Sequence, residues 1–131
     1  MSPNGQNLYD FDVGDALYRN CKIAISDSQW PDATGYVSNR LFQAMYSGAF
    51  VLQEYFEGME EYLGLQDGVH LGVWRDHSEL VELIGYWLQS GKDEERRYIA
   101  SNGQKYMIRH HSFDVRVNEM FTELDRRGIY E

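Results

Sequence analysis

Residues 35–43, Gly-Tyr-Val-Ser-Asn-Arg-Leu-Phe-Gln, combine residue types and a spacing suited to holding a phosphate group. Val37, Leu41 and Met45 recur at helical spacing, so this stretch predicts the start of a helix. The first N–H groups of a helix have no partner within it, and the positive end of the helix dipole attracts anions. We therefore expect the backbone of Gly35 to Asn39 to suit a diphosphate, with Arg40 adding a charge-assisted hydrogen bond to a phosphate oxygen.

The same stretch has an interpretation that needs no ligand. Thr34, Ser38 and Asn39 are residue types that cap helices, and Arg40 fits a solvated surface position. Residue types alone leave both interpretations open.

A second chemical feature is a pair of carboxylates, Glu54 and Glu57, in the segment from Gln53 to Gly58. Two carboxylates in one loop are the composition that acid/base catalysis requires, and we take both as candidate catalytic residues. The alternative is that they only solvate an exposed loop. Tyr55 suits stacking on a base or a sugar as well as core packing.

Histidine and cysteine residues do not predict a metal or nucleophile site. His110 and His111 are adjacent, so their side chains point apart, and no further ligand sits at metal-binding spacing. We expect His111 to fix the turn into the last helix and His70 to be structural. Cys21 lies in an apolar run and is expected to be a buried, inert thiol. Because it is the only cysteine, an internal disulfide is excluded, and the sequence suits a reducing compartment.

Three short apolar runs predict strands at residues 21–26, 49–52 and 69–74, with helices between them. Strands that alternate with helices favour right-handed parallel crossovers, hence an α/β, Rossmann-like three-layer sandwich with a small parallel sheet and a helical C-terminal part. Ligands of such sheets bind beyond the carboxyl ends of the strands, where residues 27–32 and 53–58 follow.

Helical periodicity accounts for most of the remaining sequence. Short helices are expected at 12–20 and 59–63, and the helix that begins near residue 37 should stop at Gly48. A longer helix is expected from about Lys92 to Arg109. The expected inward residues of residues 12–20 and 92–109 are Val13, Ala16, Leu17, Ile99, Gly103, Tyr106 and Met107.

Two further helices carry capping signals and a continuous apolar stripe. Asp76 and Glu79 have the spacing of a capping box, and Ser112 is suited to cap the last helix. The two expected inner faces comprise Leu80, Leu83, Ile84, Trp87 and Leu88, then Phe113, Val117, Met120, Phe121 and Leu124.

Length and charge limit the function classes. The 131 residues fit one domain, 1–131, in which 43% hydrophobic content indicates a globular chain and residues 1–11 are expected to be poorly ordered. A net charge of −9 argues against non-specific binding of nucleic acid or anionic membranes. No signal-peptide pattern and no apolar stretch of about 18 residues occur, so we expect a soluble, cytoplasmic protein without a membrane span.

Residues 35–52 resemble the C-terminal, nucleotide-sugar-binding lobe of GT-B group 1 glycosyltransferases, in the branch that includes spore-maturation-type proteins. That branch favours Asn-Arg-Leu-Phe-Glu-Ala-Met-x-x-Gly-Ala followed by an apolar strand. The other matching segments follow in order and are Val73–Asp76 with Glu79-Leu80, Ile99-Ala100 with Gly103, and His111–Phe113 with Arg116. Together the matches span roughly residues 20 to 124.

The resemblance implies a nucleoside-diphosphate sugar as donor of a hexose-type sugar, held without a metal or another cofactor. Retaining members of the superfamily carry two glutamates at this helix, which align with Gly35, at the sugar, and Gln43, at the ribose. The Gln43 amide still hydrogen-bonds hydroxyl groups, though more weakly than a carboxylate, whereas Gly35 has no side chain to offer. The implied nucleotide-binding set is therefore Gly35, Tyr36, Val37, Ser38, Asn39, Arg40 and Gln43.

The resemblance also implies that the chain is a partial lobe. The family lobe carries further β/α units before the first strand, and an acceptor-binding domain precedes them. We therefore expect a missing N-terminal acceptor domain or partner chain, self-association through a thinly covered sheet, and no turnover by the chain alone. The alternative is a degenerate, non-catalytic α/β module kept for protein–protein association, with the same fold and no affinity for nucleotides.

Overall fold

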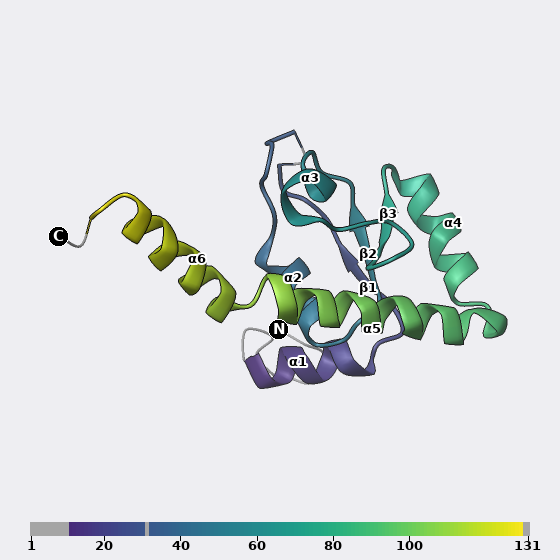
Figure 1. Cartoon of the computed structure of the whole chain (residues 1–131). Helices are drawn as coiled ribbons and strands as arrows, with labels where there is room; N and C mark the ends of the chain where they lie inside the picture. The colour runs from purple at the N-terminus through teal and green to yellow at the C-terminus, as the bar shows by residue number, and fades with distance from the viewer. Residues whose placement is uncertain (1–10, 31, 130–131) are drawn as a thin grey trace.

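The computed structural model describes residues 11–30 and 32–129 and contains one parallel sheet (Figure 1). Its three strands, in the order β1-β2-β3, are β1 (Ala24–Ser26), β2 (Val51–Glu54) and β3 (Gly72–Trp74). Each connection between parallel strands contains a helix, as parallel pairing requires. The predicted α/β, Rossmann-like class with a small parallel sheet and a helical C-terminal part is confirmed.

Helices cover both faces of this sheet. On one face lie α2 (Asn39–Tyr46) and α3 (Met59–Leu63), and on the other lies α4 (His77–Trp87). The chain continues through a short 3₁₀ helix, η1 (Ser90–Lys92), into α5 (Asp93–His110), whose side chains enter the core on both faces. The two remaining helices are α1 (Phe11–Asn20) and α6 (Phe113–Arg126). In Figure 1 the carboxyl ends of the strands are at the top, away from α1 and α5.

Alternation along β2 divides the core into two clusters. Val51 points to the face of α2, where it meets Leu41 and Leu71, both fully buried. Leu52 points to the face of α4 and packs with Phe50 and Trp87. Because side chains of a strand alternate between faces, Gln53 lies on the α2 side, below the same helix as Val51.

The strands begin and end at other residues than the sequence predicts. The predicted strand at 21–26 starts only at Ala24, and the one at 49–52 extends to Glu54, because Gln53 and Glu54 pair with residues of β3. The predicted start of the third strand is also wrong. Gly68 adopts φ 75° and its N–H bonds to Leu71 O at 2.8 Å, so residues 68–70 form a turn and Leu71 makes only an isolated bridge with Asp67.

Helix ends agree better with the sequence. Gly48, with φ 86°, stops the chain from continuing α2, as its position predicts. The Asp76 carboxylate accepts the Glu79 N–H at 2.9 Å, and the Glu79 carboxylate accepts the N–H of Arg75 at 2.7 Å. The two capping contacts expected at the start of α4 are therefore present, and Ser112 caps α6 through Val115 N–H at 3.3 Å.

Four expectations about burial are wrong. Ala16 and Leu17 of α1 are exposed, and so is Cys21, because β1 begins three residues after the cysteine. Leu88 lies beyond the end of α4 and is exposed. The expected inner face of α6 does not pack on the sheet: no residue of this helix is buried, and Phe113 is 89% exposed because the helix extends away from the body of the molecule (Figure 1).

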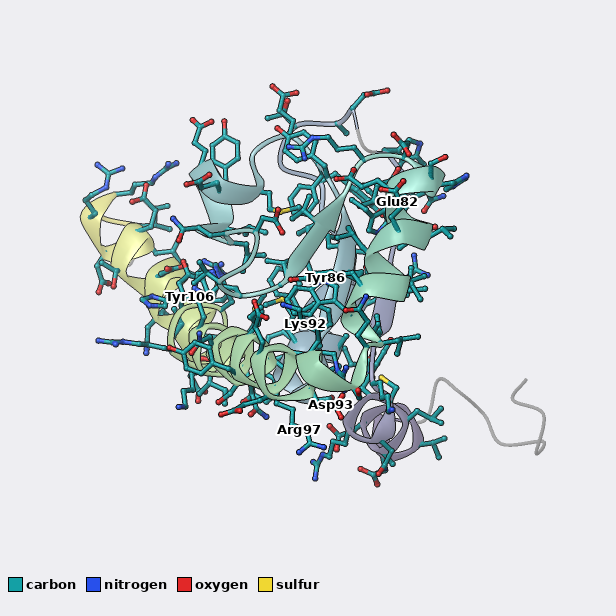
Figure 2. The ribbon with its side chains drawn as sticks, turned by 90° about the vertical axis from the view of Figure 1, so that its right-hand side faces the viewer. Glu82, Tyr86, Lys92, Asp93, Arg97 and Tyr106 are labelled. Atoms are coloured by element: carbon teal, nitrogen blue, oxygen red, sulfur yellow. The ribbon has the colours of Figure 1, made fainter. Side chains whose placement is uncertain are left out.

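A buried cation joins α4 to α5. Arg96 is 4% exposed, donates to Trp87 O at 2.6 Å and pairs with Asp93. Beside it, the Lys92 ammonium lies 4.5 Å from the centre of the Tyr86 ring, and both side chains are seen in Figure 2. The carbonyl group of the last α4 residue thus finds a donor in the following helix.

Helix α5 approaches the chain before β3 closely at Gly103. The helix is continuous through Asn102-Gly103, and Ile99, Gly103 and Met107 face inward as predicted. A Cβ atom at position 103 would lie 2.3 Å from the backbone oxygen of His70 and 2.9 Å from Cε of Met45. Only glycine therefore permits this packing distance.

We expect Gly103→Ala to lower the free energy of unfolding by about 1–3 kcal/mol, since the added methyl group overlaps backbone. Gly85→Ala in α4 is the matched control, because a Cβ there meets nothing within 4 Å. This control should stabilise the protein by about 0.5–1 kcal/mol through its helix propensity. Urea denaturation followed by circular dichroism measures both changes. Equal effects of the two substitutions would contradict the close approach.

A histidine in the turn before β3 gives this packing a pH dependence. His70 Nδ1 accepts the Gln66 N–H at 3.1 Å, and the ring lies 4.3 Å from that of Tyr106. Burial lowers the pKa of His70 below its usual 6.5, and the neighbouring His110 lowers it further. The neutral ring is therefore the form that the fold prefers.

Because the folded-state pKa of His70 lies below the unfolded value, the unfolded chain binds the proton first as pH falls. We expect the contribution of His70 to the free energy of unfolding to be fully present above about pH 6.5 and to be lost progressively as the pH falls below that value. His70→Asn keeps an acceptor for Gln66 N–H but does not titrate, so the loss between about pH 7.5 and 5.5 should be smaller in this variant. Thermal unfolding at the two pH values tests this, and an equal loss in both proteins would refute the assignment.

Candidate functional site

The carboxyl ends of all three strands meet at one edge of the sheet. Asp27 and Ser28 follow β1, Glu54 closes β2, and Arg75 follows β3. This edge is hollowed by a depression of about 700 Å³, lined by Asp32, Glu54, Tyr55, Glu57 and Arg75. The predicted location of a ligand site in an open α/β sheet therefore coincides with a surface depression.

The start of α2 lies beside this edge and keeps some of its N–H groups unpaired. The Ser38 hydroxyl accepts the Arg40 N–H at 3.3 Å and so caps the helix. Gly35 N–H bonds to Glu57 O at 3.1 Å and Tyr36 N–H bonds to Ala33 O at 3.0 Å, so neither is available to a ligand. Among the described residues, no hydrogen bond to the protein engages the N–H groups of residues 37–39.

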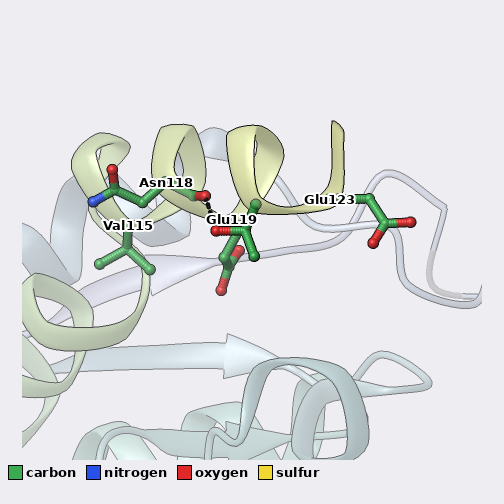
Figure 3. Close-up of a pocket in the computed structure, with 5 residues that line it drawn as sticks. Val115, Asn118, Glu119 and Glu123 are labelled. Carbon is green, nitrogen blue, oxygen red and sulfur yellow. Dashed lines mark hydrogen bonds between the residues drawn. The ribbon is translucent and has the colours of Figure 1, made fainter. Parts of the chain in front are cut away.

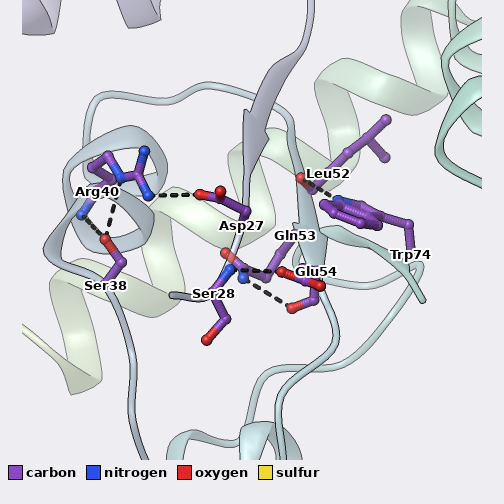
Figure 4. A network of polar contacts seen from close by, with 8 residues as sticks. All are labelled: Asp27, Ser28, Ser38, Arg40, Leu52, Gln53, Glu54 and Trp74. Carbon is purple, nitrogen blue, oxygen red and sulfur yellow. Dashed lines mark hydrogen bonds and ion pairs between the residues drawn. The ribbon is translucent and has the colours of Figure 1, made fainter. Parts of the chain in front are cut away.

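Arg40 is already paired, with the carboxylate that follows β1. Its Nη2 lies 2.6 Å from Asp27 Oδ1, and its Nε lies 3.3 Å from Ser38 Oγ (Figure 4). The side chains of Arg40 and Asp27 are 59% and 61% exposed, so the pair contributes at most about 1 kcal/mol. A phosphate group can therefore replace Asp27 at the guanidinium at little cost.

The side chain of Tyr36 lies next to the start of α2, and that of Gln43 lies within the helix. Tyr36 packs edge-on against Trp30, with ring centres 5.3 Å apart, so its ring is held in the loop before α2. Gln43 lies one turn into α2 and is partly exposed. The predicted residues 35–40 and 43 thus lie in the loop before α2 and in the first two turns of this helix.

The two candidate carboxylates have different surroundings. Glu54 Oε2 accepts the backbone N–H of Ser28 at 2.8 Å and thereby ties the chain after β1 to the end of β2. Glu57 is exposed and meets the loop before α2 only through its backbone oxygen. Tyr55, between them, lies under the Arg75 guanidinium, 4.7 Å from the ring centre.

Three buried polar atoms at this edge have no hydrogen-bond partner. They are Ser26 Oγ, Ser28 Oγ and Gln53 Oε1. Asp27, Ser28 and Gln53 lie in the predicted segments 27–32 and 53–58 but were not named as site residues, and Ser26 and Arg75 were missed. Their signal in the sequence is positional, because each lies in the last two residues of a strand or follows one within two residues.

Comparison with known protein families supplies the next observation. Residues 7–122 match the family model described as glycosyl transferase-like, a range that includes all three strands and the whole site. The chain belongs to this family. Searches of the curated proteins and of the solved structures gave no match.

Membership of the glycosyl transferase-like family confirms the broad resemblance inferred from residues 35–52. It also gives a context for the site edge, where unpaired N–H groups, Arg40, Arg75 and several polar side chains lie. Within residues 11–30 and 32–129, no three His, Cys, Asp or Glu side chains are placed to hold a metal ion. Of the helices in these residues, none combines the length and apolar character that crossing a bilayer requires.

A second depression lies along α6 and has a different character. It measures about 440 Å³, and all five of its lining residues, Val115, Asn118, Glu119, Thr122 and Glu123, belong to that helix (Figure 3). Thr122 Oγ1 donates to Asn118 O at 2.8 Å, so its hydroxyl group is used within the helix. Since no strand end contributes to it, this depression does not extend the site of the glycosyl transferase-like chain.

The Glu54 contact makes a testable distinction between the two carboxylates. Glu54→Ala removes the acceptor of a partly buried N–H group and should lower the free energy of unfolding by about 1–3 kcal/mol. Glu57→Ala, three positions beyond the end of β2 and exposed, should change it by less than about 0.5 kcal/mol. Chemical denaturation of the two variants provides the comparison. If Glu57→Ala proved the more destabilising change, the structural role assigned to Glu54 would be wrong.

Proposed function

We propose that this chain binds the nucleoside-diphosphate sugar of a glycosyltransferase that transfers a hexose-type sugar to an acceptor. In this proposal it is the donor-binding, C-terminal lobe of a GT-B group 1 enzyme, in the spore-maturation-like branch. The observation that carries the proposal is the start of α2, which brings unpaired N–H groups and Arg40 to the carboxyl edge of the sheet in a glycosyl transferase-like chain.

The diphosphate would lie at the first turn of α2. The N–H groups of residues 37–39 are the donors available there, and the helix dipole adds a favourable field. Arg40 would exchange its exposed contact with Asp27 for a charge-assisted bond to a phosphate oxygen. Gly35 and Tyr36 then act by shaping the loop, since their N–H groups are bonded within it.

Gln43 would take the nucleotide ribose, one turn further along α2. Its amide offers both a donor and an acceptor to the ribose hydroxyl groups, with less strength than a carboxylate would have. Gly35, where retaining members of the broader superfamily carry a glutamate that the spore-maturation-like branch often lacks, contributes no side chain to the sugar. We therefore expect the chain to bind its donor more weakly than a complete enzyme of this type does.

The contribution to catalysis would be electrostatic. N–H groups and Arg40 stabilise the negative charge that develops on the diphosphate as it leaves. Glu57 is the more available of the two candidate carboxylates for proton transfer, because Glu54 already holds the Ser28 N–H. An acceptor domain, from the same protein or a partner chain, would complete a cytoplasmic enzyme, and the present chain alone would not turn over.

One observation favours a second function, protein–protein association. Side chains at helical spacing on α6 are exposed, among them Phe113, Val117 and Met120, and Ile25 on the edge strand β1 is 56% exposed. Apolar side chains exposed along one helix indicate a contact surface, and Ile25 adds an exposed apolar position at the sheet edge. In this alternative the chain keeps the fold, lacks nucleotide affinity and self-associates or binds another protein.

Amide NMR titration with UDP, GDP and ADP in parallel tests donor binding. We expect shifts at residues 37–40 and 43, with one base preferred. Arg40→Ala should weaken binding by roughly tenfold or more, since a charge-assisted bond contributes about 1.5–3 kcal/mol. Arg127→Ala is the matched control, because this arginine is similarly exposed but pairs with Glu123 at the end of α6.

The absence of any shift with all three nucleotides at millimolar concentration would contradict donor binding. Sedimentation velocity of the same samples then measures self-association, which the second function predicts.

A further inference from the structure

Three buried polar atoms without partners lie at the ends of β1 and β2 or directly after them. Ser26, Ser28 and Gln53 are 3%, 8% and 2% exposed, and Ser26 Oγ, Ser28 Oγ and Gln53 Oε1 make no hydrogen bond. Among the described residues, no other buried side-chain nitrogen or oxygen lacks a partner. We call these three residues the unpaired polar cluster.

Sheet register places two of its members side by side. Ser26 and Gln53 are partners in the β1–β2 ladder, so their side chains leave the sheet on the same face. This is the face on which Ala24 and Val51 pack under α2. Ser28 follows two residues later and is held to β2 by its N–H bond to Glu54, as Figure 4 shows.

The orientation of the Gln53 amide follows from its neighbour. Its nitrogen donates to Glu54 O at 2.9 Å, and a carbonyl oxygen only accepts hydrogen bonds. The amide cannot be turned round without losing this contact, so the atom left without a partner is the oxygen. The cluster therefore presents one acceptor and two hydroxyl groups, all of them uncharged.

Such a cluster is unfavourable in a core that serves packing alone. Buried polar groups are almost always hydrogen-bonded, and those that are not call for an explanation in function or ligand binding. Alanine at position 26 or an apolar residue at position 53 would remove the penalty. Sites that break a packing rule in this way are typically functional.

The charges around the cluster define the group that it can bind. Two carboxylates, Asp27 and Glu54, adjoin it, and both would repel a phosphate placed there. A neutral group that both donates and accepts hydrogen bonds fits one acceptor oxygen and two serine hydroxyl groups. Hydroxyl groups of a sugar have this character.

Access to the cluster is linked to Arg40. The chain that leaves the sheet after Ser26 is irregular from Asp27 to Trp30, and the exposed Asp27–Arg40 pair is one of the contacts that fix it. A phosphate that takes Arg40 also releases Asp27. Segments held by few buried contacts open at low cost, so this release loosens the chain next to the cluster.

We propose that the unpaired polar cluster is the subsite for the glycosyl hydroxyl groups, opened when a diphosphate displaces Asp27 from Arg40. Gln53 Oε1 accepts a hydrogen bond from one sugar hydroxyl, and the Ser26 hydroxyl, its neighbour in the β1–β2 ladder, bonds to the same hydroxyl or to the next one. The Ser28 hydroxyl, which is directed away from the Gln53 amide in Figure 4, bonds to a different part of the sugar. These residues determine which sugar is held, whereas α2 holds the diphosphate. The assignment rests on the proposed donor-binding function.

Paired titrations separate the sugar from the nucleotide. UDP-glucose, GDP-mannose and ADP-glucose are each compared with UDP, GDP and ADP, and the side-chain amide signals of Gln53 are followed by NMR. We expect the sugar to move these signals further than the nucleotide alone. Ser26→Ala and Gln53→Met should reduce the affinity ratio of sugar nucleotide to nucleotide by about tenfold, while nucleotide affinity stays unchanged.

Gln89→Met is the matched control, because Gln89 is exposed and far from the strand ends in sequence. Unfolding without ligand gives a second readout: Ser26→Ala should leave the Tm unchanged or raise it. A fall in the Tm of this variant would mean that an ordered water or another structural contact satisfies the hydroxyl, and would overturn the proposal. So would an unchanged affinity ratio in both variants.

Failure of the proposed function has a different signature. If no nucleotide binds, the same spectra are recorded with inorganic pyrophosphate and D-glucose together, which supply an anion for Arg40 and hydroxyl groups for the cluster. Shifts of the Gln53 side-chain amide that are lost in Arg40→Ala would retain the glycosyl subsite without nucleotide binding. Their absence would remove both proposals.

Discussion

The pairing of β2 with a strand on each side is the constraint on which the rest of the structure depends. β2 fixes the register of both edge strands, and its residues alternate between the α2 and α4 faces. A shift of one residue would move Val51 and Leu52 to the wrong clusters and would turn Gln53 away from α2. The same register therefore builds the core and aligns the polar side chains at the carboxyl edge.

Periodicity in the sequence predicts the elements of this fold but not the surfaces against which they pack. The stripes of α4 and α5 were recognised because apolar residues recur at helical spacing, and both helices do cover the sheet. The stripe of α6 has an equally regular spacing, yet it faces outward. A helical pattern identifies an apolar face, whereas the distance of that face from the sheet depends on how the chain turns at His111.

The location of the site was predictable from the sequence. Residues after strands and before α2 were expected to bind ligands, and the depression lies there. The pairing of Arg40 with Asp27 and the internal bonds of the Gly35 and Tyr36 N–H groups were not predictable, because they depend on how an irregular loop returns to the sheet. The unpaired polar cluster likewise required the register, since Ser26 and Gln53 are distant in sequence.

The exposure of Cys21 has a practical consequence. It is the only cysteine of the sequence, and it lies three residues before β1 on the surface. Partial burial of its sulfur raises the pKa of the thiol, so thiolate forms only in alkaline solution. This sequence thus offers a single attachment point for a spin label, whose distance-dependent broadening of the amide NMR signals at the strand ends is measurable without any substitution.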